Sequence, residues 1–546
     1  MMKIDKKTNI IIIAINIAFV MLAVLLFGAE YDTNDDFAIA SIASGFYGFA
    51  SPKIVFSNII YGYLLVGLYH IAPMINWIIV IYYLMLVLVG TMLLQIVLLV
   101  KKRQALYYYA CLMVIFYREI YCTINFTRIA AWVAAVSYIV LAFCLSKEER
   151  FRLSRCAFAG IGLFYSSMLR LEAFLEVSAF AFVAWILQLV FKHYIHVMKL
   201  IVPYVILFSI ILVTVFVDRM SYKSDKWEEY KQWNYERAML LDYTVPDYFR
   251  YSEEYEQLGI TYAQYASLKK WCFEDSDVYS TDFFSKVRNI GQEKKYTFQK
   301  LLRKVLDIIF SNSYLWLVFL IGFICVVMNR KRHMIVSFCM LSIVAFAEIA
   351  YLVIKGRYVK RVLVGIGVGL ALFLFVTALF RDEETETGKD KNIKQYIAMA
   401  GLVIALVISG KQYSFGNSFT QGNADVLDYI EQLSRDNIVV TEPFTSRYIM
   451  SAHGLLCAPR QNLMQNSIGL GGWYSQAPKM LEKQAQLGID NIYMSLLDEN
   501  VVFLCCGAEE ICNNYLTEKT GKEIDYTPIA NFDDMSVVKY HYVERE

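Results

Sequence analysis

Residues 8–28, TNIIIIAINIAFVMLAVLLFG, carry no charged side chain and are followed at once by residues 29–37, AEYDTNDDF. An apolar helix of about 20 residues is long enough to cross the hydrocarbon core of a bilayer. The segment before it is short and basic, and no small-residue cleavage pattern follows it, so we expect a retained anchor with a cytoplasmic N-terminus. The acidic segment 31–37 would then emerge on the outer face of the membrane.

Ten further apolar stretches are long enough to form membrane-spanning helices. They lie at residues 73–100, 104–121, 129–145, 156–171, 173–191, 198–217, 305–328, 334–354, 362–380 and 394–410. The polar segments that this count places in the cytoplasm are all basic, as the positive-inside rule requires. The count works only if residues 54–70 form an interfacial or re-entrant helix and do not cross. The expected fold is therefore a polytopic α-helical membrane protein with about eleven transmembrane helices.

The composition of the whole chain agrees with a protein that lies mainly in a membrane. Of its 546 residues, 58% are hydrophobic and only 19% are charged, whereas soluble domains are about 45–50% apolar. A soluble enzyme and a disordered chain are both excluded on this ground. Lys and Arg total 52 against 50 Asp and Glu, a net charge of +2, which gives no basic field for nucleic acid. No CxxC spacing occurs among the eleven cysteines, so no zinc knuckle is expected.

The alternation of apolar and polar segments divides the chain into four parts. Residues 1–217 form an N-terminal transmembrane module with an acidic first outer loop at 29–72, and residues 218–304 form a Tyr-rich helical insert. Residues 305–410 hold the remaining transmembrane helices, and residues 411–546 form an extracytoplasmic α/β domain. Within that domain the patterns predict helices at 425–434, 477–487 and 509–516 and strands at 437–441 and 501–504. A glycine turn is expected at 469–473.

The segment Y31-D-T-N-D-D-F37 is the most specific candidate for chemistry. Neighbouring carboxylates at a membrane surface repel one another unless a cation or a reacting hydroxyl is present. Asp35 and Asp36 are therefore candidates for a general base or for ligands of Mg²⁺ or Mn²⁺. The alternative is helix capping, since Asn34 or Asp35 could cap a helix over residues 38–49.

A second candidate is K355-G-R-Y-V-K-R361, a basic loop on the side of the membrane where basic loops are disfavoured. Such an exception implies an anionic partner, and Arg and Lys beside Gly suit a phosphate or pyrophosphate at headgroup depth. The candidate phosphate-binding residues are Lys355, Arg357, Lys360 and Arg361. Contact with anionic lipid headgroups, or a wrongly assigned pair of spans, would also explain the loop.

Several charged residues fall inside apolar stretches, where they usually mark a cavity or a substrate path. In the expected topology these residues lie in the outer half of their spans. This one-sided distribution indicates a water-filled basin that is open to the outside. The expected lining residues are Asn34, Arg118, Glu119, Arg128, Arg170 and Glu172. Each residue taken alone could instead reach the outer interface or form a local ion pair.

The acidic motif N34-D-D-F37 after the first span, the interfacial segment, the number of spans and the C-terminal α/β domain together resemble the GT-C superfamily of polyprenyl-phosphate-dependent glycosyltransferases. The resemblance implies that Asp35 is the catalytic base or helps to place a divalent metal, with Asp36 beside it. It also implies that Lys355, Arg357, Lys360 and Arg361 hold the lipid-linked phosphate. The segments N234-Y-E-R237 and L241-D-Y-T-V-P-D247 resemble uncharacterised membrane proteins of Gram-positive bacteria.

The expected function is a multi-pass cell-membrane glycosyltransferase, inverting at the sugar carbon. It would transfer a sugar from a polyprenyl-phosphate donor to a glycan or other cell-envelope acceptor on the outer face. A repeat-unit polymerase, a lipid-linked glycan flippase or transporter, and a non-catalytic envelope scaffold remain alternatives. A flippase would need a polar pathway to the cytoplasmic face, and a scaffold would tolerate loss of Asp35.

Overall fold

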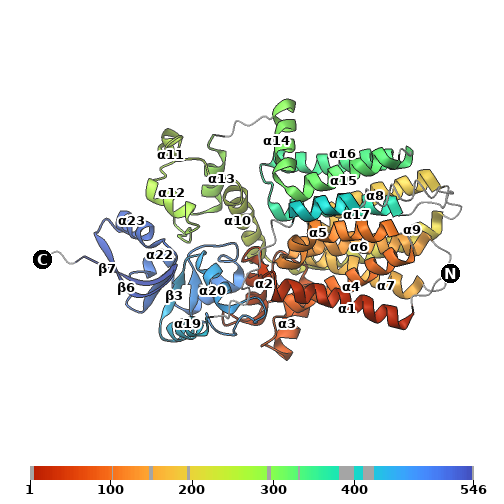
Figure 1. Cartoon of the computed structure of the whole chain (residues 1–546). Coiled ribbons are helices and arrows are strands. Elements are labelled where there is room, and N and C mark those ends of the chain that lie inside the picture. Colours follow the sequence, from red (N-terminus) through yellow and green to blue (C-terminus); the bar gives the residue numbers. More distant parts are fainter. Residues whose placement is uncertain are drawn as a thin grey trace.

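The computed structural model describes residues 5–100, 103–146, 152–192, 197–291, 297–329, 332–379, 399–409 and 423–543. Within these residues, seven helices are long and apolar enough to cross a membrane. They are α1 (Lys6–Leu25), α4 (Trp77–Leu99), α6 (Phe126–Ser146), α8 (Leu171–Lys192), α9 (Val197–Ser221), α16 (Arg332–Lys355) and α17 (Lys360–Leu379). They run side by side in one bundle, and a small sheet lies beyond one end of it (Figure 1). The chain is thus mostly helical, with the apolar helices of a multi-pass membrane protein.

The remaining expected spans form helices that do not meet this measure of length and hydropathy. The stretch 104–121 becomes α5 (Arg103–Tyr117) and a single π-helical turn, η1 (Arg118–Cys122). The stretch 156–171 becomes α7 (Arg152–Leu169). Only Met399–Ser409 is described of the stretch 394–410, and it is a short apolar helix.

The prediction of one continuous helix over residues 305–328 is wrong. The segment forms α14 (Phe298–Ser311) and α15 (Ser313–Asn329), which meet at 95°. Asn312 lies between them, where its amide donates to the Ile308 carbonyl at 2.7 Å and its side-chain oxygen accepts the Tyr314 hydroxyl at 3.1 Å. Local bonds of this kind compete with helix continuation. If the bent pair is one broken span, the number of candidate spans is eight.

The segment between α1 and α4 contains two helices that are too short to cross a bilayer. They are α2 (Asp35–Ser44) and the 13-residue α3 (Ile59–Ile71). Asn58 caps α3 by accepting the Ile60 N–H at 3.0 Å. Gly62 of α3 lies so close to the loop before it that an added Cβ would fall 1.9 Å from the Pro52 carbonyl oxygen. The loop is therefore folded back on itself, and it runs beside the end of α2, where the Ser51 N–H donates to the Ile42 carbonyl at 2.9 Å.

Helix α6 forms the centre of the bundle, packed against α4, α7, α8 and α17. Alanines at 130, 131, 134 and 135 are fully buried, and small side chains of this kind let helices approach closely in a membrane. Gly365 of α17 lies against α6, because its added Cβ would fall 3.3 Å from that of Ala131. Tight packing of α6 on α17 fixes the start of α17, and with it Lys360 and Arg361.

The Tyr-rich insert is helical, as expected, and follows α9 directly. Its helices are α10 (Asp225–Leu241), α11 (Ser252–Gln257), α12 (Tyr262–Lys269) and α13 (Thr281–Asn289). Rings of Trp227, Tyr230, Trp233 and Phe284 pack together along α10 and α13. The aromatic side chains therefore build a core for the insert.

The C-terminal region is a small α/β fold with a mixed sheet of order β4-β3-β5-β7-β6. Strands β4, β3 and β5 are parallel, while β7 and β6 form an antiparallel hairpin at one edge. The elements are α19 (Ala424–Asp436), β3 (Ile438–Thr441), α20 (Thr445–His453), β4 (Ser467–Gly469), α21 (Pro478–Gln486), α22 (Ile492–Ser495), β5 (Val501–Cys505), α23 (Glu509–Thr520), β6 (Ile524–Phe532) and β7 (Met535–Tyr542). The five elements predicted from the sequence all lie among them.

The insert and the α/β region are joined by a buried polar interface. The Leu470 carbonyl accepts backbone N–H groups of Phe273 and Glu274 at 2.9 and 3.1 Å. Asp275 accepts the Tyr515 hydroxyl at 2.7 Å and also pairs with Lys519. Because these buried groups find hydrogen-bond partners across the interface, the insert and the sheet stabilise one another.

Glu274 at this interface gives a pH-dependent test of that coupling. Burial raises the pKa of Glu274 from 4.5 to about 7. The folded protein therefore holds a proton that the unfolded chain has lost, so stability falls as pH rises from about 4.5 and levels off above about 7. We expect Glu274→Gln to reduce this fall by up to about 3 kcal/mol, measured as the difference in Tm between pH 5 and pH 8. Glu253→Gln, an exposed change on the same insert, should leave the pH dependence as it is; an unaltered pH dependence in Glu274→Gln would contradict the assignment.

Candidate functional site

The acidic segment is held by a short parallel pairing between distant parts of the chain. Strand β1 (Glu30–Tyr31) pairs with β2 (Thr123–Ile124), which follows the π-helical turn η1. Helix α2 begins directly after this strand, at Asp35. Its N-cap residue, Asn34, makes no capping bond with its side chain, and its amide donates to the Ser446 hydroxyl at 2.6 Å. The Asn34 side chain therefore does not cap α2. It connects the acidic segment to the α/β region instead.

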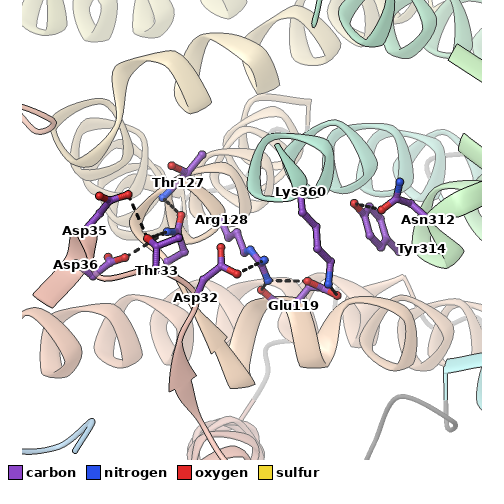
Figure 2. A network of polar contacts seen from close by, with 11 residues as sticks. Asp32, Thr33, Asp35, Asp36, Glu119, Thr127, Arg128, Asn312, Tyr314 and Lys360 are labelled. Carbon is purple, nitrogen blue, oxygen red and sulfur yellow. Dashed lines mark hydrogen bonds and ion pairs between the residues drawn. The ribbon is translucent and has the colours of Figure 1, made fainter. Parts of the chain in front are cut away.

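Asp35 and Asp36 are neighbours in sequence but lie in different surroundings (Figure 2). The Asp35 side chain remains 17% exposed, accepts the Thr33 hydroxyl at 3.2 Å and lies 3.7 Å from the Arg361 guanidinium. Asp36 is fully buried and accepts the Tyr82 hydroxyl and the Phe126 N–H, each at 2.9 Å, on one oxygen. Asn125 donates to its other oxygen at 3.3 Å. Asp36 therefore ties α2 to α4 and α6, and Asp35 alone of the pair is open to a ligand.

These contacts do not fit a metal ion shared by Asp35 and Asp36. Mg²⁺ and Mn²⁺ prefer several carboxylate or carbonyl oxygens around one point. Both oxygens of Asp36 already accept hydrogen bonds from protein donors. Across the described ranges, no three His, Cys, Asp or Glu side chains come together as a ligand set. We therefore derive no step through a metal at this pair.

Arg128 is the centre of a buried ion-pair network beside Asp35 and Asp36 (Figure 2). Its fully buried guanidinium lies 2.8 Å from Asp32 and 2.6 Å from Glu119. Lys360 reaches the other oxygen of Glu119 at 2.7 Å. The expectation that Glu119 and Arg128 line an open basin is not met, because they neutralise each other inside the protein. The network instead joins Asp32, the residue after β1, to η1, α6 and α17.

Of the four basic residues in loop 355–361, two line the cavity described next and two make other contacts. Arg357 lies 3.0 Å from Asp242 at the end of α10, and Arg361 lies beside Asp35. Lys355 is exposed beside the ring of Tyr351, 5.9 Å from its centre. Lys360 is committed to Glu119. Two of the four predicted phosphate-binding residues therefore remain candidates.

A cavity of about 420 Å³ lies where the acidic segment, the basic loop, the insert and the α/β region meet. Asn34, Asp35 and Arg170 line it from the N-terminal module, and Arg357 and Arg361 line it from the basic loop. The two oppositely charged loops, more than 300 residues apart in sequence, thus reach one pocket. Arg170 packs over the rings of Phe56 and Phe126, with 5.5 and 5.4 Å to their centres, and pairs with the exposed Glu172 at 3.0 Å. Glu172 and Arg118 do not line this cavity.

The predicted site residues include none from the insert or the α/β region, although these parts form much of the cavity lining. The lining residues of these parts include Asn234, Arg237, Asp242, Trp271, Glu442, Ser446, Arg447 and Trp473. With Arg170, Arg357 and Arg361, five arginines face the cavity against three carboxylates, those of Asp35, Asp242 and Glu442. Asp242 joins two of the arginines, since its oxygens lie 3.4 Å from Arg237 and 3.0 Å from Arg357. The excess of guanidinium groups favours an anionic ligand.

The glycine turn at 469–473 forms one edge of the cavity and fits the turn expected there. An added Cβ on Gly471 would fall 1.8 Å from the Trp271 carbonyl oxygen, and Gly472 has a φ of 119°. Only glycine permits this close approach and this backbone angle without strain. The turn therefore brings Trp473 and Trp271 to the same pocket.

Together these features define a class of protein: a mostly helical chain with several helices able to span a membrane, and an arginine-rich cavity between the helix bundle and a small mixed sheet. No family model matches the chain, and no curated protein matches it.

Proposed function

We propose that the protein is a membrane glycosyltransferase that transfers a sugar from a polyprenyl-phosphate donor to a cell-envelope glycan or other acceptor. The observation that carries this proposal is the meeting of Asp35 with Arg357 and Arg361 at one cavity. A phosphate needs guanidinium groups, and a reacting hydroxyl needs a base. The cavity has both, beside helices that could lie in a membrane.

The arginines supply the site for the donor phosphate. Arg170, Arg357 and Arg361 line the cavity where it borders the helix bundle. The Arg357 Nε is buried and makes no hydrogen bond with the described residues, so it has a donor to offer to a ligand. Guanidinium groups bind phosphate through paired, charge-assisted hydrogen bonds. They would also offset the negative charge that grows on the phosphate as it leaves.

Asp35 supplies the base. It accepts the proton of an acceptor hydroxyl while the acceptor oxygen forms a bond to the anomeric carbon of the donor sugar. The bond from that carbon to the phosphate oxygen breaks, and its electron pair leaves with the polyprenyl phosphate. Attack opposite the leaving group inverts the configuration at the anomeric carbon.

The proposed orientation has a cytoplasmic N-terminus and an extracytoplasmic α/β region. Helix α1 begins at the end of the bundle away from the sheet (Figure 1). Helices α5, α7 and α16 begin with Arg103, Arg152 and Arg332, and under this orientation these arginines lie on the cytoplasmic side. The donor would then reach Arg357 and Arg361 laterally from the outer leaflet of the cell membrane.

Donor binding by the purified full-length protein in lipid nanodiscs tests this proposal. We expect Arg357→Gln and Arg361→Gln each to weaken retention of a polyprenyl-phosphate sugar about tenfold, because a hydrogen bond to a charged group contributes about 1.5–3 kcal/mol. Lys355→Gln is the matched control, since it removes a positive charge from the same loop but outside the cavity. It should change retention less than twofold.

Two results would overturn the proposal. One is equal retention of the donor by the wild type, Arg357→Gln and Arg361→Gln. The other is an equal loss in all three loop variants, which would indicate a general effect of surface charge on the lipid. The first result includes the case in which none of these proteins retains the donor at any ionic strength, as expected for a protein that acts only as a scaffold.

A further inference from the structure

The part of the cavity formed by the insert and the α/β region has its own arrangement of charge and aromatic rings. Arg237 of α10 is only 2% exposed, yet it lines the cavity. Its Nε donates to the Asn234 side-chain oxygen at 2.9 Å, and another of its nitrogens lies 3.4 Å from Asp242. Its guanidinium lies over the ring of Trp271, 5.2 Å from the centre. Arg237 is thus fixed in place by contacts on several sides.

Trp271 is held in a conformation that a bulky residue rarely adopts. Its φ is 62°, in the left-handed region, which costs a residue other than glycine about 1–3 kcal/mol. Gly471 packs directly on its carbonyl oxygen, and the N–H groups of Phe273 and Glu274, which follow soon after, donate to the Leu470 carbonyl. The interface between insert and sheet therefore maintains this strained position, which keeps the indole at the cavity edge with Trp473.

Arg447 adds a second positive charge to this part of the lining. It lies in the first turn of α20 and is exposed. Among the described residues, no carboxylate lies within 4.0 Å of its guanidinium, which instead lies over the ring of Phe444, 5.7 Å from its centre. Ser446 beside it binds Asn34 of the acidic segment. Arg447 is therefore available to a ligand and close in sequence to a residue that contacts the proposed catalytic loop.

We infer that this part of the cavity, with Arg237, Arg447, Trp271 and Trp473, binds an acceptor carbohydrate that carries a negative charge. This inference rests on the proposed function. An indole face offers an apolar surface against which the ring of a sugar can pack. Two guanidinium groups beside it favour a sugar with a carboxylate or phosphate over a neutral one. A uronic acid and a sugar phosphate share this chemistry.

The test is a binding measurement that does not need sugar transfer. The full-length protein in nanodiscs without donor is titrated with glucuronic acid, glucose 6-phosphate and glucose, and binding is followed by saturation-transfer NMR. We expect at least one of the two anionic sugars to bind about tenfold more tightly than glucose. The stronger of the two identifies the source of the charge as a carboxylate or a phosphate.

Variants then locate the binding site. Arg447→Gln and Arg237→Gln should each abolish the preference for the anionic sugar, and Arg237→Lys should keep part of it. Arg447 is exposed, so its variant tests the inference even if Arg237→Gln does not fold. Arg250→Gln, an exposed change on the insert outside the cavity, is the control and should bind like the wild type.

Equal affinity for all three sugars would overturn the inference. Loss of the preference in Arg361→Gln but not in the Arg237 and Arg447 variants would also overturn it, because the anion would then occupy the proposed donor site. The proposed function is tested separately. If donor retention does not depend on Arg357 and Arg361 but binding of anionic sugars still depends on Arg447, the carbohydrate site is supported and the transferase proposal is rejected. If donor retention behaves as expected but no anionic preference exists, only the acceptor inference is lost.

Discussion

Replacing Asp35 with asparagine is expected to lower the rate of sugar transfer by about 10²–10⁴-fold, the usual contribution of a general base. Asparagine has nearly the same shape but accepts no proton. Asp35 is partly exposed at the cavity, where it accepts the Thr33 hydroxyl and forms a long pair with Arg361. The change therefore leaves the buried network around Asp36 in place. Transfer is measured with the donor in nanodiscs and a cell-envelope glycan as the acceptor.

Donor retention should not weaken in the same variant, because the lost carboxylate carries the same sign of charge as the phosphate. Asp425→Asn, an exposed change in the first turn of α19, is the control and should transfer at the wild-type rate. Transfer at the wild-type rate by Asp35→Asn would show that another group accepts the proton. Loss of both transfer and folding would point instead to a structural role for Asp35, which monodispersity and Tm would reveal.

Long apolar stretches and strongly patterned elements could be predicted from the sequence. The spans at 8–28, 73–100 and 334–354 correspond to α1, α4 and α16, because about twenty apolar residues have few alternatives to a helix in a membrane. The strand at 501–504 is fully buried at the centre of the sheet, and its run of apolar residues reflects that position. Here local composition and tertiary environment agree.

Elements whose position depends on a partner could not be predicted in this way. Strand β6 (Ile524–Phe532) is largely exposed and contains Pro528, where its pairing with β7 shifts register. Proline and mixed polarity argue against a strand, but both are tolerated at a sheet edge. The bend at Asn312 was missed for a similar reason, since residues 305–328 satisfy the hydropathy of a single span although side-chain bonds break the helix there.

Only part of the candidate site could be predicted from the sequence. The acidic and basic loops are unusual for their place in the chain, and both contribute to the cavity. Arg237 and Trp271 lie among many polar and aromatic residues of the insert, so the local sequence does not show which of these residues face a cavity. Glu119 and Arg128 were predicted to line a basin because they are charged residues inside apolar stretches. Hydropathy alone cannot distinguish a solvent-filled basin from a buried ion-pair network. That distinction requires the partner's position in space.

Arg128 gives the largest expected effect on stability. Its guanidinium is fully buried between Asp32 and Glu119. Replacing it with methionine keeps most of the side-chain volume but leaves Glu119 buried with only the exposed Lys360 as a partner. Removing one member of a buried ion pair costs about 3–5 kcal/mol, a large part of the 5–15 kcal/mol by which folded domains are stable. We expect a strongly lowered Tm in detergent and a reduced yield of monodisperse protein.

The structural role of Arg128 can be separated from a role in transfer. Adding Glu119→Gln to Arg128→Met removes the uncompensated charge, so the double variant should recover part of the lost stability, as coupled neighbours do. Arg460→Gln is the control, because its pairs with Asp428 and Glu431 lie at the surface and should contribute less than about 1 kcal/mol. If Arg128→Met kept the wild-type Tm but lost transfer, Arg128 would act on the substrate. The buried network would then be part of the site and not only the support that holds β1, and with it Asp35, against α6.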